Sequence, residues 1–314
     1  LRGPILAPGQ KAGNLRPEIA KTLGLPESVV VSAATIDAHA GVPGCGVGGP
    51  GKMVMIMGTS TCHMIMTEEA RFFKGFAGLV KDGILSGYYG YEYGQPAVGD
   101  IFAWFIENCV PHAYYEEAKS RGVSLYELLE AKASRLVPGE SGLVALDWHN
   151  GNRSVLMDAS LRGVVVGYTL KTKAEEVYRA LIEATAFGTR KIVETHEAGA
   201  GPVESIHACG GLTKNRMLMQ VYADVLGRPI RVAPSSQPVA LGAAIFGALA
   251  VGAEGGGYDR PAEAVENMVK GFFEVYRPHE GNWKLYAGLY RDYVKLHDYF
   301  GVRKEFHCGQ TRGE

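Results

Sequence analysis

The clearest fold signal in the sequence is an apolar strand that leads through two adjacent glycines into an amphipathic helix. Residues 203–209 form the apolar run, Gly210 and Gly211 follow it, and the apolar residues of 217–226 recur at the spacing of one helix face. A further apolar run at 230–233 follows the helix. Strands and helices that follow one another in this way are typical of an α/β domain.

The other predicted elements alternate irregularly, which favours an α/β fold with a mixed sheet. Predicted strands cover 29–33, 53–57, 62–66, 141–146 and 164–167, and predicted helices cover 97–109, 123–135, 173–199, 238–250 and 283–296. Thr172 and Glu175 predict a capping box for the long helix. The aromatic, glycine-rich residues 87–95 predict a shaped loop, and the small residues 41–51 predict a short packed helix followed by a hinge.

Composition excludes several classes of protein. Lys and Arg total 32 against 33 Asp and Glu, a net charge of −1, so the chain lacks the basic surplus of nucleic-acid and anionic-membrane binders. The longest uncharged apolar stretch, 239–253, is too short to span a bilayer. Glycine, at 42 of 314 residues, is about twice as frequent as the usual 7%. Many tight turns and close backbone approaches are therefore expected.

The cysteines and histidines predict neither a disulfide framework nor a metal site. The five cysteines are scattered and contain no C-x-x-C pair: Cys45, Cys62, Cys109, Cys209 and Cys308. This pattern favours reduced thiols and a cytoplasmic location. The nine histidines show no H-x-x-H or H-E-x-x-H spacing, so no residue is assigned to a protein-bound metal.

The turn between the strands at 53–57 and 62–66 is the first candidate binding segment. Gly58, Thr59, Ser60 and Thr61 combine a tight turn with three hydroxyls. Backbone N–H groups and hydroxyls in such a turn can hold phosphate oxygens. The alternative is an ordinary hairpin turn whose hydroxyls face solvent.

Two further candidates are the double glycine and an aspartate. Gly210 and Gly211 would let a flat ligand lie on the backbone, and Asn215 stands at the start of the following helix, where N–H donors are unpaired. A plain strand-to-helix turn is equally compatible with this pattern. Asp37 follows an apolar strand and could take a proton from a substrate hydroxyl, although an aspartate there is more often a helix cap.

The order of these three features resembles the FGGY carbohydrate kinases, within the wider group of actin, hexokinase and heat-shock-chaperone ATPases. The resemblance covers nearly the whole chain and continues at 162–167, 220–227, 240–244 and 276–278. Within the family it is strongest to the members that act on L-ribulose, in the runs 36–41, 57–64, 90–95, 99–105 and 147–153. The implied fold is a ribonuclease H-like domain with a five-stranded type of mixed sheet flanked by helices.

The resemblance implies an ATP-dependent transfer of the γ-phosphoryl group to a hydroxyl of L-ribulose. Asp37 would be the general base and Glu92 would bind the sugar. Six positions would contact ATP, the phosphates at Gly58, Thr59 and Ser60 and the adenosine at Gly210, Gly211 and Asn215. Mg²⁺ would be carried on the nucleotide phosphates.

The resemblance also implies a domain division. Residues 1–50 would be the tail of an N-terminal sugar-binding domain, and residues 51–314 would be the nucleotide-binding domain. Because the first residue is Leu1 and the family carries a whole domain before this segment, we expect the chain alone to bind nucleotide weakly and to phosphorylate nothing. Uncovered apolar surface on the tail would favour self-association.

Two alternatives remain open at the level of sequence. The substrate could be another pentulose or a polyol, such as xylulose. The chain could instead be an actin-like or chaperone-like module whose binding is gated by nucleotide. A requirement for sugar in ADP production distinguishes a kinase from such a module.

Overall fold

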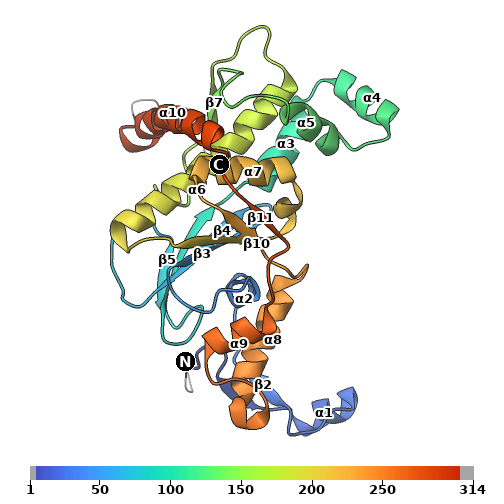
Figure 1. Cartoon of the computed structure of the whole chain (residues 1–314), viewed down its shortest axis with the longest axis vertical. Coiled ribbons are helices and arrows are strands. Elements are labelled where there is room, and N and C mark those ends of the chain that lie inside the picture. The colour runs from blue at the N-terminus through green and yellow to red at the C-terminus, as the bar shows by residue number, and fades with distance from the viewer. Residues whose placement is uncertain (1–4, 305–314) are drawn as a thin grey trace, which may run out of the picture.

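A seven-stranded mixed sheet with helices on both faces forms the centre of the molecule (Figure 1). The structure is a computed structural model and describes residues 5–304. In their order across the sheet, the strands are β11 (Glu274–Tyr276), β10 (Ile230–Val232), β9 (Ser205–Cys209), β3 (Lys52–Met57), β4 (Thr61–Thr67), β6 (Tyr89–Gln95) and β5 (Gly78–Lys81).

Helices and smaller elements surround this sheet. The α-helices are α1 (Pro17–Leu23), α2 (Asp37–Gly44), α3 (Gly99–Cys109), α4 (His112–Arg121), α5 (Leu125–Ala133), α6 (Ala174–Gly199), α7 (Arg216–Leu226), α8 (Pro238–Val251), α9 (Pro261–Met268) and α10 (Glu280–His297). Two small sheets pair β1 (Lys11–Asn14) with β2 (Val30–Ser32) and β7 (Val144–Leu146) with β8 (Val164–Val166). The short helical turns are η1 (Gly211–Lys214), η2 (Ala253–Gly255) and η3 (Asp298–Val302).

The strand directions make the large sheet mixed. Strands β3, β9 and β10 are parallel, whereas β4 is antiparallel to both β3 and β6. These five adjacent strands form the mixed sheet that the resemblance implies. Strands β5 and β11 add an antiparallel strand at each edge, so the sheet has seven strands in all. The expected α/β class with a mixed sheet is confirmed.

Strand β3 is buried on both faces of the sheet. Met53, Met55 and Met57 belong to the apolar cluster that includes α6, α7 and α10, whereas Val54 belongs to the cluster formed with α2 and α8. Successive side chains of a strand point to opposite faces. A mostly apolar strand is therefore required where helices cover the sheet on both sides, as Figure 1 shows.

Helices α2 and α8 are in backbone contact through a glycine on each helix. A Cβ atom on Gly44 would lie 1.8 Å from the carbonyl oxygen of Pro238, and one on Gly242 would lie 1.7 Å from that of Ala40. Neither position can hold a larger residue without moving a helix. This contact fixes α2, which begins at Asp37, against the C-terminal half of the chain.

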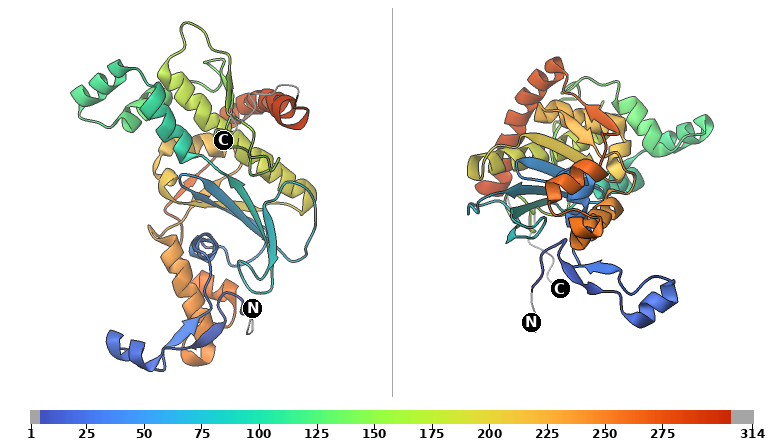
Figure 2. Two further views of the ribbon diagram at one scale, coloured as in Figure 1. Left: turned by 180° about the vertical axis from the view of Figure 1, so that it is seen from behind. Right: turned by 60° about the horizontal axis from the view of Figure 1, so that its bottom comes forward.

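Strands β1 and β2 and helix α1 extend away from the large sheet (Figure 2). This segment exposes apolar side chains, including Ile19, Leu23 and Val31. Strand β2 packs against α8, so residues before position 50 contact residues well after it. The expected domain boundary near residue 50 stays a prediction. The outermost residues of the two expected domains, 1–4 and 305–314, lie outside the described residues.

The predicted loop at 87–95 is wrong, because most of it is strand β6. The strand pairs with β4 along its full length, from Tyr89 opposite Thr67 to Gln95 opposite Thr61. The tyrosines recur at every second position, which is a strand signal that the interspersed glycines obscured. The glycines in this strand make room for side chains that lie across it.

The predicted capping box of α6 is also wrong, by one residue. The backbone N–H of Lys173 donates to Oε2 of Glu176 at 2.6 Å. Thr172 lies in the preceding turn, where its hydroxyl oxygen accepts from the N–H of Thr169 at 2.9 Å. The other predicted strands and helices are confirmed within about three residues at each end.

The predicted free thiols can be checked at four of the five cysteines. Cys45, Cys62, Cys109 and Cys209 are free, and Cys308 lies outside the described residues. Among residues 5–304, no helix has both the length and the apolar character needed to cross a membrane.

Candidate functional site

The turn after β3 and the double glycine after β9 lie side by side at one edge of the sheet. Strands β3 and β9 are parallel, with Ile56 opposite Cys209. Gly210 has φ of +103°, and a Cβ atom there would lie 2.2 Å from the carbonyl oxygen of Met57, the residue before Gly58. Only glycine fits this position, so the two segments can touch through their backbones.

The Gly58–Ser60 turn is held by backbone hydrogen bonds. The N–H of Gly58 donates to the carbonyl of Ser60 at 2.8 Å, and the N–H of Val98 donates to the carbonyl of Thr59 at 2.7 Å. The N–H of Gly99, the first residue of α3, donates to the Gly58 carbonyl at 3.1 Å. The side chains of Thr59 and Ser60 are exposed, which leaves their hydroxyls available to a ligand.

The third nucleotide candidate, Asn215, has a structural role in the protein itself. Its Oδ1 accepts from the N–H of Leu218 at 2.8 Å and so caps α7. Its side chain also bonds the hydroxyl of Tyr178. Gly211, by contrast, is open: nothing lies within 4 Å of a Cβ atom built there. The structure thus leaves room for a ligand above Gly211.

Asp37 lies in the first turn of α2 and is exposed. Its Oδ1 accepts from the N–H of Ala38 at 2.7 Å. The N-cap is Ile36, so Asp37 is inside the helix and does not occupy the N-cap position. Its second carboxylate oxygen has no hydrogen bond within the described residues. A carboxylate with one oxygen free in this way can accept a proton from a bound hydroxyl.

The Cys62 thiol shows that separate carboxylates converge next to this edge. Cys62 is the second residue of β4 and is half-buried. Burial raises the pKa of the Cys62 thiol, and the charges of Glu92 and Asp37 raise it further, whereas Arg153 lowers it. These charges come from separate elements that meet here: Arg153, in the loop after β7, pairs with Glu92 of β6, and Nε2 of His39 of α2 lies 3.9 Å from the same carboxylate.

Glu92 is held between two basic side chains. Nη2 of Arg153 donates to its Oε1 at 2.5 Å, and Nε2 of His39 lies 3.9 Å from its Oε2. Nδ1 of His39 lies 2.7 Å from the carbonyl oxygen of Gly83, which fixes the orientation of the ring. Glu92 thus presents a fixed carboxylate to the same space as Asp37.

Residues 53–251 match the model of the C-terminal domain of the FGGY family of carbohydrate kinases. The chain belongs to the FGGY family. The matched residues include the turn at Gly58 and the double glycine at Gly210, which the structure places together.

Curated relatives of this FGGY chain are named ribulokinases. The chain is 54% identical to that of Geobacillus thermodenitrificans over 302 residues, which are 96% of this chain and 54% of the relative. It is 48% identical to that of Mycolicibacterium smegmatis over 298 residues, which are 95% of this chain and 52% of the relative. The chain therefore spans about half the length of the curated relatives it matches.

Solved structures share the fold. A xylulose kinase from Rhodospirillum rubrum has a TM-score of 0.80 at 24% identity, over 96% of this chain and 57% of the other. A glycerol kinase from Plasmodium falciparum, solved with ADP, has a TM-score of 0.74 at 18% identity, over 92% and 55%. These neighbours confirm the actin- and hexokinase-like fold expected from the sequence.

Sequence reasoning assigned no role to two residues that the structure places at the candidate site, Arg153 and His39. Both lie in runs that carry the resemblance, 147–153 and 36–41. Arg153 is 61 positions from Glu92, so no local spacing could pair the two. The sequence signal that pointed to these two residues was the unusual amino-acid composition of 36–41 and 147–153.

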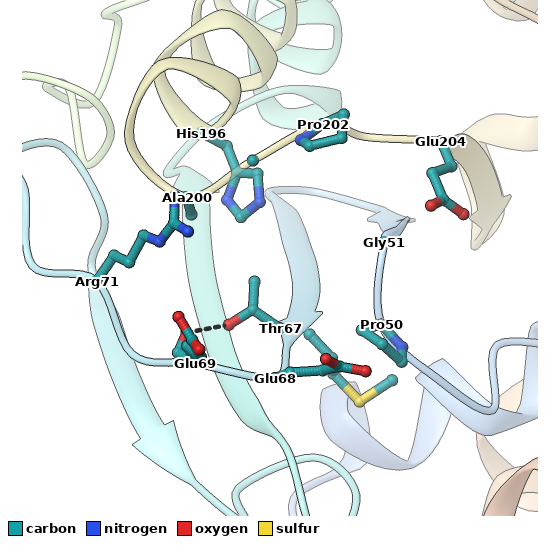
Figure 3. Close-up of a pocket in the computed structure, with 12 residues that line it drawn as sticks. Pro50, Gly51, Thr67, Glu68, Glu69, Arg71, His196, Ala200, Pro202 and Glu204 are labelled. Atoms are coloured by element: carbon teal, nitrogen blue, oxygen red, sulfur yellow. Dashed lines mark hydrogen bonds between the residues drawn. The ribbon is translucent and has the colours of Figure 1, made fainter.

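A pocket of about 430 Å³ lies at the other ends of the strands (Figure 3). Its lining includes Gly51 before β3, Thr67 at the end of β4 and His196 near the end of α6. His196 is buried, its Nδ1 lies 2.9 Å from the Tyr93 hydroxyl, and burial lowers its pKa to about 4. None of the predicted site residues lines this pocket, so it is separate from the candidate site.

Within residues 5–304, no group of three or more histidine, cysteine, aspartate or glutamate side chains could hold a metal ion. The Gly58 turn instead offers hydroxyl and backbone groups, which suit phosphate oxygens. The residues of the Gly58 turn therefore fit the phosphate groups of a nucleotide.

Proposed function

We propose that this chain supplies the nucleotide-binding part of an ATP-dependent kinase that phosphorylates L-ribulose. The observation that carries the proposal is the backbone contact between the Gly58 turn and the Gly210 turn at one edge of the sheet, together with the contact of His39 on α2, the helix that begins at Asp37, with Glu92. The curated relatives named ribulokinase support the choice of sugar. They are longer than this chain, so the activity is proposed for the complete enzyme.

Asp37 is proposed as the general base. Its carboxylate takes the proton from a sugar hydroxyl while that oxygen forms a bond to the γ-phosphorus and the bond from this phosphorus to the bridging oxygen of ADP breaks. The transition state of phosphoryl transfer is loose, so positioning and charge neutralisation supply most of the acceleration. A general base adds about 10²- to 10⁴-fold.

The nucleotide is proposed to lie across the two glycine turns. Gly58, Thr59 and Ser60 would hold its phosphates: the hydroxyls and backbone N–H groups of Thr59 and Ser60 would donate to them, and Gly58, whose N–H is donated to Ser60, would form the tight turn beside them. The open backbone at Gly211 would face the adenosine. Gly210 and Asn215 would form the rest of the adenosine contact. Mg²⁺, carried on the phosphates, would neutralise part of their charge.

The sugar is proposed to bind at Glu92, with residues 1–50 belonging to a sugar-binding domain and residues 51–314 forming the nucleotide-binding domain. The separate β1–β2 sheet and its exposed apolar side chains support this division. The same exposed surface supports self-association of the isolated chain. The near-zero net charge supports a partner set of ATP and sugar without nucleic acid or membrane, and the free thiols support a cytoplasmic location.

Two measurements test the proposal. Isothermal titration of the 314-residue chain with ADP should give weak but saturable binding, and a chain that binds neither ADP nor ATP would overturn the nucleotide assignment. The second measurement uses a hybrid in which this chain replaces the matching half of the Geobacillus thermodenitrificans ribulokinase. We expect this hybrid to release ADP only when L-ribulose is present.

A substrate panel on the hybrid separates the alternatives. Faster turnover with xylulose or a polyol than with L-ribulose would change the assigned sugar. ADP release that needs no sugar would favour a nucleotide-gated binding module. A well-folded hybrid that releases no ADP with any sugar would overturn the proposed kinase function.

A further inference from the structure

Arg153 is a basic side chain that pairs with Glu92, the proposed sugar-binding residue. It lies across strand β6 at Gly94, where a Cβ atom would approach Cδ of Arg153 to 2.9 Å and Nη1 to 3.2 Å. The loop that carries it is tied to the same strand, because the N–H of Gly94 donates to the hydroxyl of Ser154 at 3.1 Å. Glycine at position 94 therefore allows the guanidinium to reach over the strand.

From this position Arg153 reaches two groups on neighbouring strands. It donates to Glu92 at 2.5 Å, and it lowers the pKa of the thiol of Cys62, which lies opposite Gly94 on β4. The side chain of Arg153 is 46% exposed and that of Glu92 is 24% exposed, so both face an opening. A cavity of about 370 Å³ beside them is lined by Arg153 together with Asn150 and Asn152.

The charges around Cys62 are unbalanced without Arg153. Two carboxylates, Glu92 and Asp37, act on the thiol, and Arg153 is the cation that acts on it in the opposite direction. An arginine fork fixes the plane of a carboxylate better than a single charge does. Removal of this guanidinium would take the hydrogen-bonded cation from Glu92 and leave the longer contact with His39, at 3.9 Å.

We propose that Arg153 is a positioning residue for the sugar: it holds the Glu92 carboxylate in the orientation that binds substrate and offsets the combined negative charge of Glu92 and Asp37. This inference rests on the proposed kinase function and deepens it. It assigns no contact between Arg153 and ATP, so sugar and nucleotide parameters should respond differently.

The first test compares Arg153→Gln and Arg153→Lys in the hybrid enzyme. Arg153→Gln should raise the KM for L-ribulose about 5- to 50-fold while the KM for ATP changes less than threefold. Arg153→Lys should restore part of the loss, because lysine returns the charge without the fork. Arg121→Gln is the matched control: Arg121 pairs with Glu117 at 2.6 Å with similar exposure, but on α4. It should leave both KM values unchanged.

The second test uses the 314-residue chain and needs no enzyme activity. In a Cys109→Ser, Cys308→Ser background, the rate of Cys62 alkylation by iodoacetamide is followed against pH. Because Arg153 lowers the pKa of the Cys62 thiol and Glu92 raises it, Arg153→Gln should move the midpoint upward and Glu92→Gln should move it downward.

The two tests fail in different ways. An unchanged L-ribulose KM in Arg153→Gln overturns the positioning role, as does an equal loss of sugar and ATP affinity accompanied by a lower melting temperature. An unmoved Cys62 midpoint in Arg153→Gln shows that Arg153 does not act on the charges around Cys62 and overturns the proposed offset of negative charge. A wild-type hybrid without sugar-dependent ADP release instead overturns the proposed function, and the alkylation profile then still reports whether Arg153 acts on the cluster.

Discussion

The glycine turns and the charged cluster beside them are held in place by different means. Gly58 and Gly210 are positioned by backbone hydrogen bonds and by a contact that excludes any side chain. Asp37, Glu92 and Arg153 are side chains from three separate elements, and Glu92 and Arg153 hold each other through a side-chain ion pair. We infer that changes in the glycine turns alter folding and nucleotide binding together, whereas changes in the charged cluster alter chemistry or sugar binding with little effect on folding.

Among changes in the charged cluster, Asp37→Asn should give the largest loss of turnover. Removal of a general base lowers turnover by about 10²- to 10⁴-fold. Asp37 is exposed and its one hydrogen bond, to the N–H of Ala38, can also be accepted by an asparagine, so stability should change little. Steady-state kinetics of the hybrid should show the loss in kcat with ATP affinity unchanged. A drop in kcat of less than about threefold removes Asp37 from the base role.

Gly210→Ala tests the glycine turns, which are held in place by backbone contacts. The new Cβ atom would lie 2.2 Å from the Met57 carbonyl oxygen at a φ of +103°, so β3 and β9 must separate or the turn must be rebuilt. We expect a loss of about 3 kcal/mol in the free energy of unfolding and loss of ADP binding. Gly211→Ala, with nothing within 4 Å, is the control and should stay within about 0.5 kcal/mol of wild type. Urea denaturation measures the stability of both variants and ADP titration measures binding to Gly210→Ala. Equal free energies of unfolding for the two variants would contradict the comparison.

A buried aspartate beneath β6 gives the third test. Asp147 accepts from the amide of Gln95 at 2.7 Å, and Gln95 ends the strand that carries Glu92. Burial raises the pKa of Asp147 to about 6 from its ordinary value near 4. The folded protein therefore binds the proton more tightly than the unfolded chain. The stabilisation from this group is fully present below about pH 4 and is lost as pH rises through 6.

Asp147→Asn should remove this pH dependence. Two pKa units correspond to about 3 kcal/mol, so the stability of wild type relative to the variant should fall by about that amount between pH 4 and pH 7. Urea denaturation of both proteins at four pH values measures the difference in their free energies of unfolding. The buried histidines change stability with pH in the opposite direction, and their contribution cancels because it is the same in both proteins. A difference that stays constant across this range would show that Asp147 does not titrate there.

The contrast between the two parts also explains what the sequence could predict. The strand, Gly210 and the following helix are contiguous, so local spacing revealed the turn and its need for glycine. The hairpin at Gly58 was likewise visible as two apolar runs with a short polar turn. Their proximity follows from the parallel pairing of β3 and β9, which the mixed sheet allowed but no local pattern specified.

The charged cluster was only partly predictable. Asp37 and Glu92 were assigned through resemblance to a family, whereas Arg153 and His39 were missed because their partners lie far away in the chain. Glycines in residues 87–95 also concealed strand β6. These glycines are explained by tertiary contacts: Gly94 makes room for the Arg153 side chain, which no propensity scale includes.

Asn215 combines a side chain with a backbone hydrogen bond, and its substitution is expected to give the smallest effect on stability and ADP binding. As the N-cap of α7 it accepts from the N–H of Leu218, and serine can replace it in that role. Asn215→Ala should cost about 1 kcal/mol in the free energy of unfolding, while Asn215→Ser should stay within a few tenths of wild type. If the side chain also contacts adenosine, both variants should weaken ADP binding by about three- to tenfold, because neither keeps the amide. Titration calorimetry beside urea denaturation separates the two roles, and wild-type ADP affinity in Asn215→Ser would leave Asn215 as a helix cap alone.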